Sequence, residues 1–174
     1  MDQTILAVDD RGEFLEYIPK EVGHTGDGKR HLAIAVLLYN SKGQVLLQKR
    51  KHKIFDNIWD ITGATHPLRS GNTDETMEEA TERCLSEEWG IKQKITLKNL
   101  GFFNYFAKYN GFCENEHCFL MTGQYDGELS LNPDLGYEYK WVERAEFLKD
   151  IAQNPANYTP WAKEASRLLP EYLQ

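Results

Sequence analysis

The segment GATHPLRSGNTDETMEEATERCLSEEWGI, residues 63–91, decides the fold of this chain. It predicts the end of a strand, a loop and then one helix of about four turns. Thr73 is suited to cap the helix, because a threonine hydroxyl accepts a hydrogen bond from a free N–H of the first turn. Asp74 and Glu75 are then expected in that turn, where the helix dipole favours acidic side chains. Gly90 is expected to end the helix.

Polar residues gather on one side of this predicted helix. Ala80, Arg83, Cys84, Glu87 and Glu88 follow one another at spacings of three and four, so several of them share a face. A solvated acidic face is the simplest interpretation of such a helix. That interpretation competes with a specific pattern in the same residues.

The pattern resembles the Nudix box, which runs glycine, five residues, glutamate, seven residues and then Arg-Glu-apolar-x-Glu-Glu-x-Gly-apolar. The matching positions are Glu75, Arg83, Leu85, Glu87, Glu88, Gly90 and Ile91. Two positions differ: Arg69 stands where the opening glycine is expected, and Cys84 replaces a glutamate that is a metal ligand in the hydrolases. The resemblance implies an α/β (α+β) Nudix fold, a mixed β-sheet sandwiched between helices. It argues less strongly for hydrolysis.

The composition predicts one globular domain. The chain has 174 residues, enough for a core, and 41% of them are apolar, without a segment as long as a membrane span. The net charge of −7 argues against nonspecific binding to nucleic acids or membranes. It permits an anionic small-molecule substrate, because metal ions and local basic residues can override the overall sign. The sequence does not decide between a monomer and a homodimer.

The predicted compartment is the cytoplasm. The opening residues, MDQTILAVDDRGEF, have neither the basic start nor the apolar run of a secretory signal. The three cysteines, Cys84, Cys113 and Cys118, form no Cys-x-x-Cys pair, so reduced thiols are expected.

The order of predicted elements is a mixed one. We expect strands over 4–9, 14–18, 31–40, 44–50, 58–64, 95–107, 116–125 and 137–143, a polar glycine-rich loop over 19–30, a short helix over 144–151 and a last helix opening at Thr159-Pro160. Together they predict a single domain over residues 1–174, with an N-terminal hairpin over about 1–20 and a C-terminal helix over about 159–172.

Candidate metal ligands come from three distant segments. His24 lies in the glycine-rich loop, His31 opens a buried strand and His66 follows the strand before the helix. Glu114 and Glu116 are two apart on a strand, so their carboxylates point to one face and would repel each other without a cation between them. Isolated histidines are more often structural, and the glutamates could line a solvated edge. Together, the five would suit Mn2+, Mg2+ or Zn2+.

The order of these motifs is similar to the type 1 isopentenyl-diphosphate isomerases, a branch of the Nudix fold, from about residue 20 to about residue 165. In that family two histidines seven apart, the histidine of a Cys-x-His-Pro motif and both glutamates of Glu-Asn-Glu bind one metal. The corresponding residues here are His24, His31, His66, Glu114 and Glu116. The resemblance implies interconversion of isopentenyl and dimethylallyl diphosphate in isoprenoid biosynthesis. It also implies a second Mg2+ on the substrate diphosphate, held by Glu88 and with it Glu87.

The same resemblance implies the residues that contact substrate. These are Lys20, Arg50, Lys53, Arg83 and Trp161. The ring of Trp161 is expected to face the allylic cation, since an aromatic face attracts positive charge. Tyr105 lies near the family's active-site tyrosine. Without the resemblance, Arg50 and Lys53 would be assigned to a solvated basic loop and Trp161 to the core.

Isomerisation needs two acid–base groups on opposite sides of the substrate. The resemblance assigns Glu116 to one side and the motif cysteine to the other, but the motif here is Ala64-Thr65-His66-Pro67. Three explanations stay open: an engineered exchange of cysteine for alanine, a divergent relative that acts on another diphosphate, or substitution by the hydroxyl of Thr62 or Thr65. Cys118 shares strand parity with Glu116 and is expected on the wrong side to replace the cysteine.

Two other functions fit the same residues. A Nudix hydrolase could use Glu87 and Glu88 to hold Mg2+ on a diphosphate linkage and help activate water. A non-catalytic diphosphate-binding protein would also tolerate Ala64.

Overall fold

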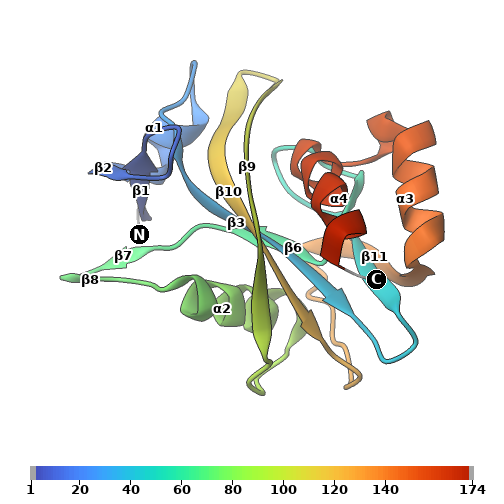
Figure 1. Cartoon of the computed structure of the whole chain (residues 1–174). Helices are drawn as coiled ribbons and strands as arrows, with labels where there is room; N and C mark the ends of the chain where they lie inside the picture. The colour runs from blue at the N-terminus through green and yellow to red at the C-terminus, as the bar shows by residue number, and fades with distance from the viewer. Residues whose placement is uncertain (1–2, 173–174) are drawn as a thin grey trace.

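A strongly curled mixed sheet forms the centre of the molecule (Figure 1). The structure is a computed structural model and describes residues 3–172. Nine strands form the sheet: β1 (Thr4–Val8), β2 (Phe14–Pro19), β3 (His31–Tyr39), β4 (Gln44–Arg50), β5 (Trp59–Asp60), β6 (Gly63–Thr65), β9 (Leu97–Tyr109), β10 (Phe112–Gln124) and β11 (Gly136–Glu143). A small separate hairpin consists of β7 (Arg69–Ser70) and β8 (Thr73–Asp74).

Helices cover both faces of the sheet. They are α1 (Lys20–His24), α2 (Met77–Trp89), α3 (Arg144–Gln153), a 3-10 turn over Pro155–Asn157 and α4 (Pro160–Tyr172). In Figure 1, α2 lies on one side of the sheet and α3 and α4 lie on the other. The predicted α/β fold, a mixed sheet between helices, is confirmed.

Strand β3 separates two layers of the core, because its alternate side chains point to opposite faces. Ile34, Val36 and Leu38 pack against the helix α2 side, with Trp89. Ala33, Ala35 and Leu37 pack in the cluster that contains residues of α3 and α4. Both sets are buried, which explains the nearly continuous apolar sequence of β3.

A parallel pairing of β3 with β10 positions the candidate ligands. Its register places Glu116 opposite His31, at the start of β3. On its other edge, β10 pairs antiparallel with β9 and places Glu116 opposite Tyr105. Residues that are far apart in sequence are thus fixed side by side by backbone hydrogen bonds.

The predicted start of helix α2 was wrong by three residues. Thr76 caps the helix: its hydroxyl accepts a hydrogen bond from Glu79 N at 3.1 Å, and the Glu79 carboxylate accepts one from Thr76 N at 2.8 Å. This reciprocal capping box satisfies two backbone donors, whereas Thr73 has no glutamate three residues later. Thr73 and Asp74 belong to β8 instead.

The predicted end of α2 is confirmed at Gly90. This glycine adopts a left-handed conformation with φ of 67°, and its N–H bonds to the carbonyls of Leu85 and Ser86. Glycine adopts positive φ without steric cost.

Three further boundaries differ from the predictions. The loop predicted over 19–30 contains the short helix α1, and the strand predicted over 58–64 is divided into β5 and β6. Strands β9 and β10 have 13 residues each and meet at a tight turn where Asn110 and Gly111 both have positive φ. Strand β10 therefore begins before Glu114.

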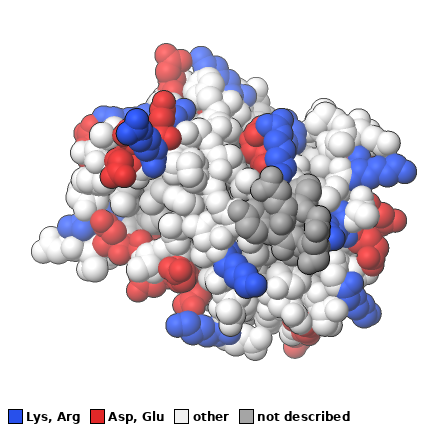
Figure 2. Space-filling view, in the orientation of Figure 1, with Lys and Arg blue, Asp and Glu red and all other residues white. Residues whose placement is uncertain are grey.

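The described residues include no helix that is both long and apolar enough to span a bilayer. On the face drawn in Figure 2, acidic and basic side chains are interspersed.

Candidate metal centre and adjoining pocket

Five metal-binding side chains converge at one point. His24 ends α1, His31 opens β3, His66 follows β6, and Glu114 and Glu116 lie on β10. One donor atom from each of them lies within 4.8 Å of all the others. Opposite ligands of an octahedral ion are about 4.2 Å apart, so only small movements are needed to surround an ion. The structure thus brings together all five predicted ligands.

The donor atoms already contact one another. His66 Nε2 lies 3.0 Å from Glu116 Oε1, His24 Nε2 lies 3.1 Å from Glu114 Oε2, and His31 Nε2 lies 3.5 Å from Glu116 Oε1. The imidazole rings are 4.6 to 5.0 Å apart between centroids. Such crowding of imidazoles and carboxylates suits a divalent cation.

Backbone carbonyls orient two of the histidines. His24 Nδ1 lies 2.7 Å from the carbonyl of Lys20, and His31 Nδ1 lies 2.8 Å from that of Lys29. These contacts place the proton on Nδ1 and leave Nε2 of each ring with a lone pair for a metal. His31 Nε2 is buried and has no hydrogen-bond partner among the described residues. The donor set therefore fits Mn2+, Mg2+ or Zn2+.

Charge coupling splits the pKa values of this centre. Burial and the charge of Glu116 raise the pKa of Glu114. Burial works against ionisation of Glu116 too, but His31 and the hydrogen bond from Tyr105 together outweigh it, and the pKa of Glu116 is lowered. Burial and the neighbouring His31 hold the pKa of His66 well below its usual range. A neutral His66 and an ionised Glu116 are the forms that bind metal.

Tyr105 is joined directly to this centre. Its hydroxyl donates a hydrogen bond of 2.5 Å to Glu116 Oε2. Burial and the charge of Glu116 raise the pKa of the Tyr105 phenol well above its usual range, so it stays protonated. Tyr105 therefore fixes the carboxylate that the family resemblance assigns as one of the two acid–base groups.

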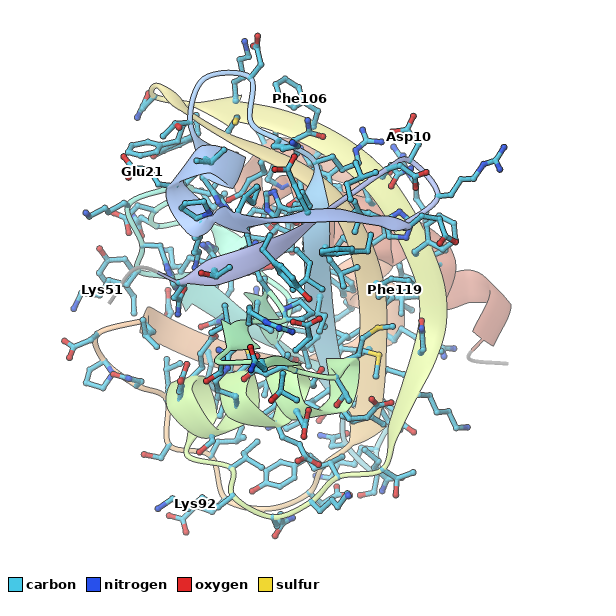
Figure 3. All side chains as sticks on the ribbon, turned by 90° about the vertical axis from the view of Figure 1, so that its left-hand side faces the viewer. Asp10, Glu21, Lys51, Lys92, Phe106 and Phe119 are labelled. Atoms are coloured by element: carbon cyan, nitrogen blue, oxygen red, sulfur yellow. The ribbon has the colours of Figure 1, made fainter. Side chains whose placement is uncertain are left out.

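A pocket of about 350 Å³ opens beside the metal centre. Figure 3 shows this side of the molecule, where the N-terminal hairpin and α1, near Glu21, lie above α2. The pocket is lined by every predicted site residue except the fully buried His31: Lys20, His24, Arg50, Lys53, Ala64, His66, Arg83, Glu87, Glu88, Tyr105, Glu114, Glu116 and Trp161.

Helix α2 contributes one wall of the pocket. Glu88 is buried, accepts a hydrogen bond from Gln48 Nε2 at 2.6 Å and lies 3.4 Å from Cys84 Sγ. Burial raises the pKa of Glu88 to about 7, against the effect of Gln48. The side chain of Glu87 is 60% exposed. Burial and the charge of Glu88 raise the pKa of the Cys84 thiol well above its usual range.

Arg83 is already engaged within the protein. Its guanidinium donates two hydrogen bonds to the Glu75 carboxylate, at 2.8 and 2.9 Å, and one of 2.9 Å to the carbonyl of His66. It also bonds to the Thr65 hydroxyl at 3.2 Å. Arg83 therefore links α2 to the loop that carries a metal ligand.

The hydroxyls considered as replacements for the missing thiol differ in position. Thr62 is completely buried and uses its hydroxyl within the sheet, with Leu46 O at 2.9 Å and Leu38 N at 2.8 Å. Thr65 lines the pocket beside Ala64. Cys118 is buried in the core below α4.

Sequence reasoning did not identify two residues that hold candidate site side chains in place. Gln48 positions Glu88 from β4, and the buried Asp60 bonds Arg50 Nη1 at 3.1 Å and the Thr159 hydroxyl at 2.9 Å. Both contacts join distant segments, so sequence spacing carried no signal for them. A buried acid beside a pocket arginine becomes recognisable only in the fold.

Comparisons with known proteins agree with this architecture. The NUDIX domain model matches residues 29–162. The chain is 33% identical to an isopentenyl-diphosphate Delta-isomerase of Nocardia farcinica, covering 90% of this chain and 89% of that protein. It is 29% identical to isopentenyl-diphosphate Delta-isomerase 1 of Aromatoleum aromaticum, covering 92% and 89%.

Solved structures share the fold at low sequence identity. The crystal structure of DR0079 from Deinococcus radiodurans has a TM-score of 0.73 and 22% identity, covering 95% of this chain and 99% of that one. A MutT protein from Methanosarcina mazei Go1 has a TM-score of 0.61 and 19% identity, covering 83% and 96%.

Proposed function

Because this chain belongs to the Nudix superfamily, we propose that it is an isopentenyl-diphosphate isomerase-like protein that requires a divalent metal and acts on an allylic diphosphate. One observation carries the proposal: three imidazoles and two carboxylates meet within 4.8 Å beside a pocket with basic residues. The metal would be held by His24, His31, His66, Glu114 and Glu116. When bound, it supplies a positive charge that keeps Glu116 ionised.

Proton transfer is assigned to Glu116 with the assistance of Tyr105. The hydrogen bond from the Tyr105 hydroxyl leaves one carboxylate oxygen oriented, and pocket exposure gives a substrate carbon access to this pair. Lys20, Arg50 and Lys53 are proposed to bind the diphosphate, since all three line the pocket. A second Mg2+ on the diphosphate is proposed to be held by Glu88 and Glu87.

The opposite side of the proposed reaction has no thiol. Ala64 lines the pocket with a methyl group, which cannot carry a proton. Thr65 provides the neighbouring hydroxyl, but it already accepts a hydrogen bond from Arg83. We therefore expect weak isomerisation in the protein as it stands.

A diphosphate hydrolase is the second candidate, favoured by the carboxylate that helix α2 places in the pocket wall. Glu88 lines the pocket with a pKa raised to about 7 by burial, a value suited to accepting a proton from water near neutral pH. Cys84 in place of the third box carboxylate argues against it. A non-catalytic diphosphate-binding protein is the third.

One assay separates these functions. The protein is incubated with isopentenyl diphosphate or with nucleoside diphosphate derivatives, in the presence of Mg2+ or Mn2+, and allylic product and released phosphate are both measured. Allylic product supports the isomerase, and phosphate release without allylic product supports the hydrolase. Tight binding without either product supports the binding protein. Failure of the protein to bind Mn2+ or any diphosphate would contradict all three.

A further inference from the structure

The loop between two candidate metal ligands is tied to β10 by one side chain. This loop joins His24, at the end of α1, to His31, at the start of β3. Asn115 Nδ2 donates a hydrogen bond of 3.0 Å to the carbonyl of Gly28, and Asn115 Oδ1 accepts one of 3.1 Å from Arg30 Nε. A single amide of β10 therefore holds the loop at two residues.

The amide of Asn115 acts from the face of the sheet opposite the metal centre. Asn115 lies between Glu114 and Glu116, and successive side chains of a strand point to opposite faces. Its two partners also fix which end of the amide donates, because a carbonyl only accepts a hydrogen bond and a guanidinium only donates one. Asn115 can therefore influence the metal centre only through the loop that it holds.

The two residues that Asn115 holds lie on either side of the group that orients His31. Lys29 stands between Gly28 and Arg30, and its carbonyl lies 2.8 Å from His31 Nδ1. A metal-binding histidine is commonly oriented by such a contact of its second ring nitrogen. Movement of this segment would displace the carbonyl and release the His31 ring.

The loop has little rigidity of its own. Gly26 and Gly28 have positive φ angles of 66° and 57°, a conformation that glycine adopts without steric cost but also leaves easily. Gly28 packs so closely on β10 that an added Cβ would lie 2.5 Å from Cys113 Sγ. A loop of this kind samples many conformations unless side chains restrain it, and ordering it during metal binding would weaken the affinity.

We propose that Asn115 is a positioning residue of the metal centre. By holding Gly28 and Arg30 it keeps the Lys29 carbonyl and His31 in the metal-binding arrangement before an ion arrives. This role rests on the proposed function, because it takes the cluster of three histidines and two glutamates as a metal site. It deepens that function by assigning a part in metal binding to a side chain that contacts neither ion nor substrate.

The test uses Asn115→Leu, which has a similar size and removes both hydrogen bonds at a half-buried strand position. Calorimetry measures Mn2+ binding to the metal-free protein, and we expect the affinity to fall about tenfold. Asn104→Leu is the matched control. Asn104 lies on the same face of the neighbouring strand β9 and donates a hydrogen bond of 2.8 Å to the carbonyl of Asp10, so its loss should leave the affinity unchanged.

Hydrogen exchange separates positioning from a general loss of stability. The amide of Gly28 bonds the carbonyl of Thr25 at 3.0 Å, and the amide of Lys29 bonds that of Val22 at 3.4 Å. We expect both amides to exchange about tenfold faster in metal-free Asn115→Leu than in the metal-free wild type, and Mn2+ to restore slow exchange. Amides of helix α2 should exchange at the same rate in both proteins.

Three results would contradict this role. Equal Mn2+ affinity of Asn115→Leu and wild type, or exchange that speeds up equally in the loop and in α2, would overturn the role of Asn115 and leave the proposed function standing. Absence of Mn2+ binding by the wild type would overturn both. If Asn115→Leu does not fold, Asn115→Ser is measured in the same way, because a serine hydroxyl is too short to reach both partners.

Discussion

The two ends of the pocket differ in how completely they are equipped. At the metal-centre end, all five expected donors are present, and backbone carbonyls orient His24 and His31. At the end beside helix α2, called the α2 end, a cysteine stands at position 84 where a carboxylate is expected, and an alanine stands at position 64 where a thiol is expected. The metal-centre end thus has every expected group, and the α2 end lacks two of them.

This difference separates binding from proton transfer. Metal and anion binding are shared among many side chains, so one substitution weakens them without abolishing them. Isomerisation needs a titratable group at a fixed place on each side of the substrate, so a single alanine at one of these places weakens it strongly. The complete metal-centre end predicts strong metal binding, and the incomplete α2 end predicts slow isomerisation.

The largest expected effect comes from restoring the missing thiol at the α2 end. Ala64→Cys restores a proton-carrying group next to the metal ligand loop, and we expect isomerisation of isopentenyl diphosphate to rise by about 10² to 10⁴-fold. Product formation is measured by chromatography in the presence of Mn2+ and Mg2+. Ala64→Ser serves as a control of similar size. A cysteine variant that loads metal normally but gains nothing would show that the two ends are not parts of one isomerase site.

Removing a candidate ligand from the metal-centre end should have the next largest effect. His31→Gln removes a buried candidate ligand at the point where β3 meets β10, and we expect Mn2+ affinity to fall about a hundredfold. Calorimetry on the metal-free protein measures this affinity. His117→Gln is the control, since His117 bonds Asn104 outside the pocket and should leave affinity unchanged. Equal losses in the two variants would contradict the assignment of the centre.

The pH dependence of stability should distinguish the ends as well. Burial raises the pKa of Glu88 to about 7, from an ordinary value of 4.5. The folded state therefore binds this proton more tightly than the unfolded state does, and its contribution to stability is full below pH 4.5 and lost as pH rises toward 7. Glu88→Gln should raise the stability of the metal-free protein at pH 8 by about 3 kcal/mol and change it little at pH 4.5.

Denaturant titrations at several pH values measure that difference. Glu78→Gln, at an exposed position of the same helix, is the matched control. A benefit of Glu88→Gln that is equal at both pH values would mean that burial does not perturb this carboxyl.

The smallest expected effect concerns the stability of helix α2, which forms one wall of the pocket. Thr76→Ala removes the capping hydroxyl of α2 and should cost about 1 kcal/mol of unfolding free energy. Thr73→Ala should cost less, because Thr73 lies in β8 and does not cap the helix. Neither change should alter Mn2+ affinity, and a parallel loss of it in Thr76→Ala would show that the two ends are coupled.

Residue patterns predicted most strands, because alternation with a period of two expresses local strand geometry. The resemblance to the family motifs predicted all five converging ligands. The capping box Thr76-x-x-Glu79 is visible in the sequence, whereas the prediction of Thr73 rests on hydroxyl chemistry alone. Helix α1 was missed because residues 19–30 are polar and glycine-rich, and its position depends on contacts with β10 and β2. The contacts of Gln48 and Asp60 are made across the fold, so no local pattern could have shown them.

The parallel pairing of β3 with β10 also determines when the centre can form. His31 and Glu116 meet only after two segments far apart in the chain have paired, a step that loop closure makes slow. A divalent ion can therefore recognise its complete ligand set only late in folding. Metal should slow the unfolding rate of the native protein while leaving the refolding rate almost unchanged.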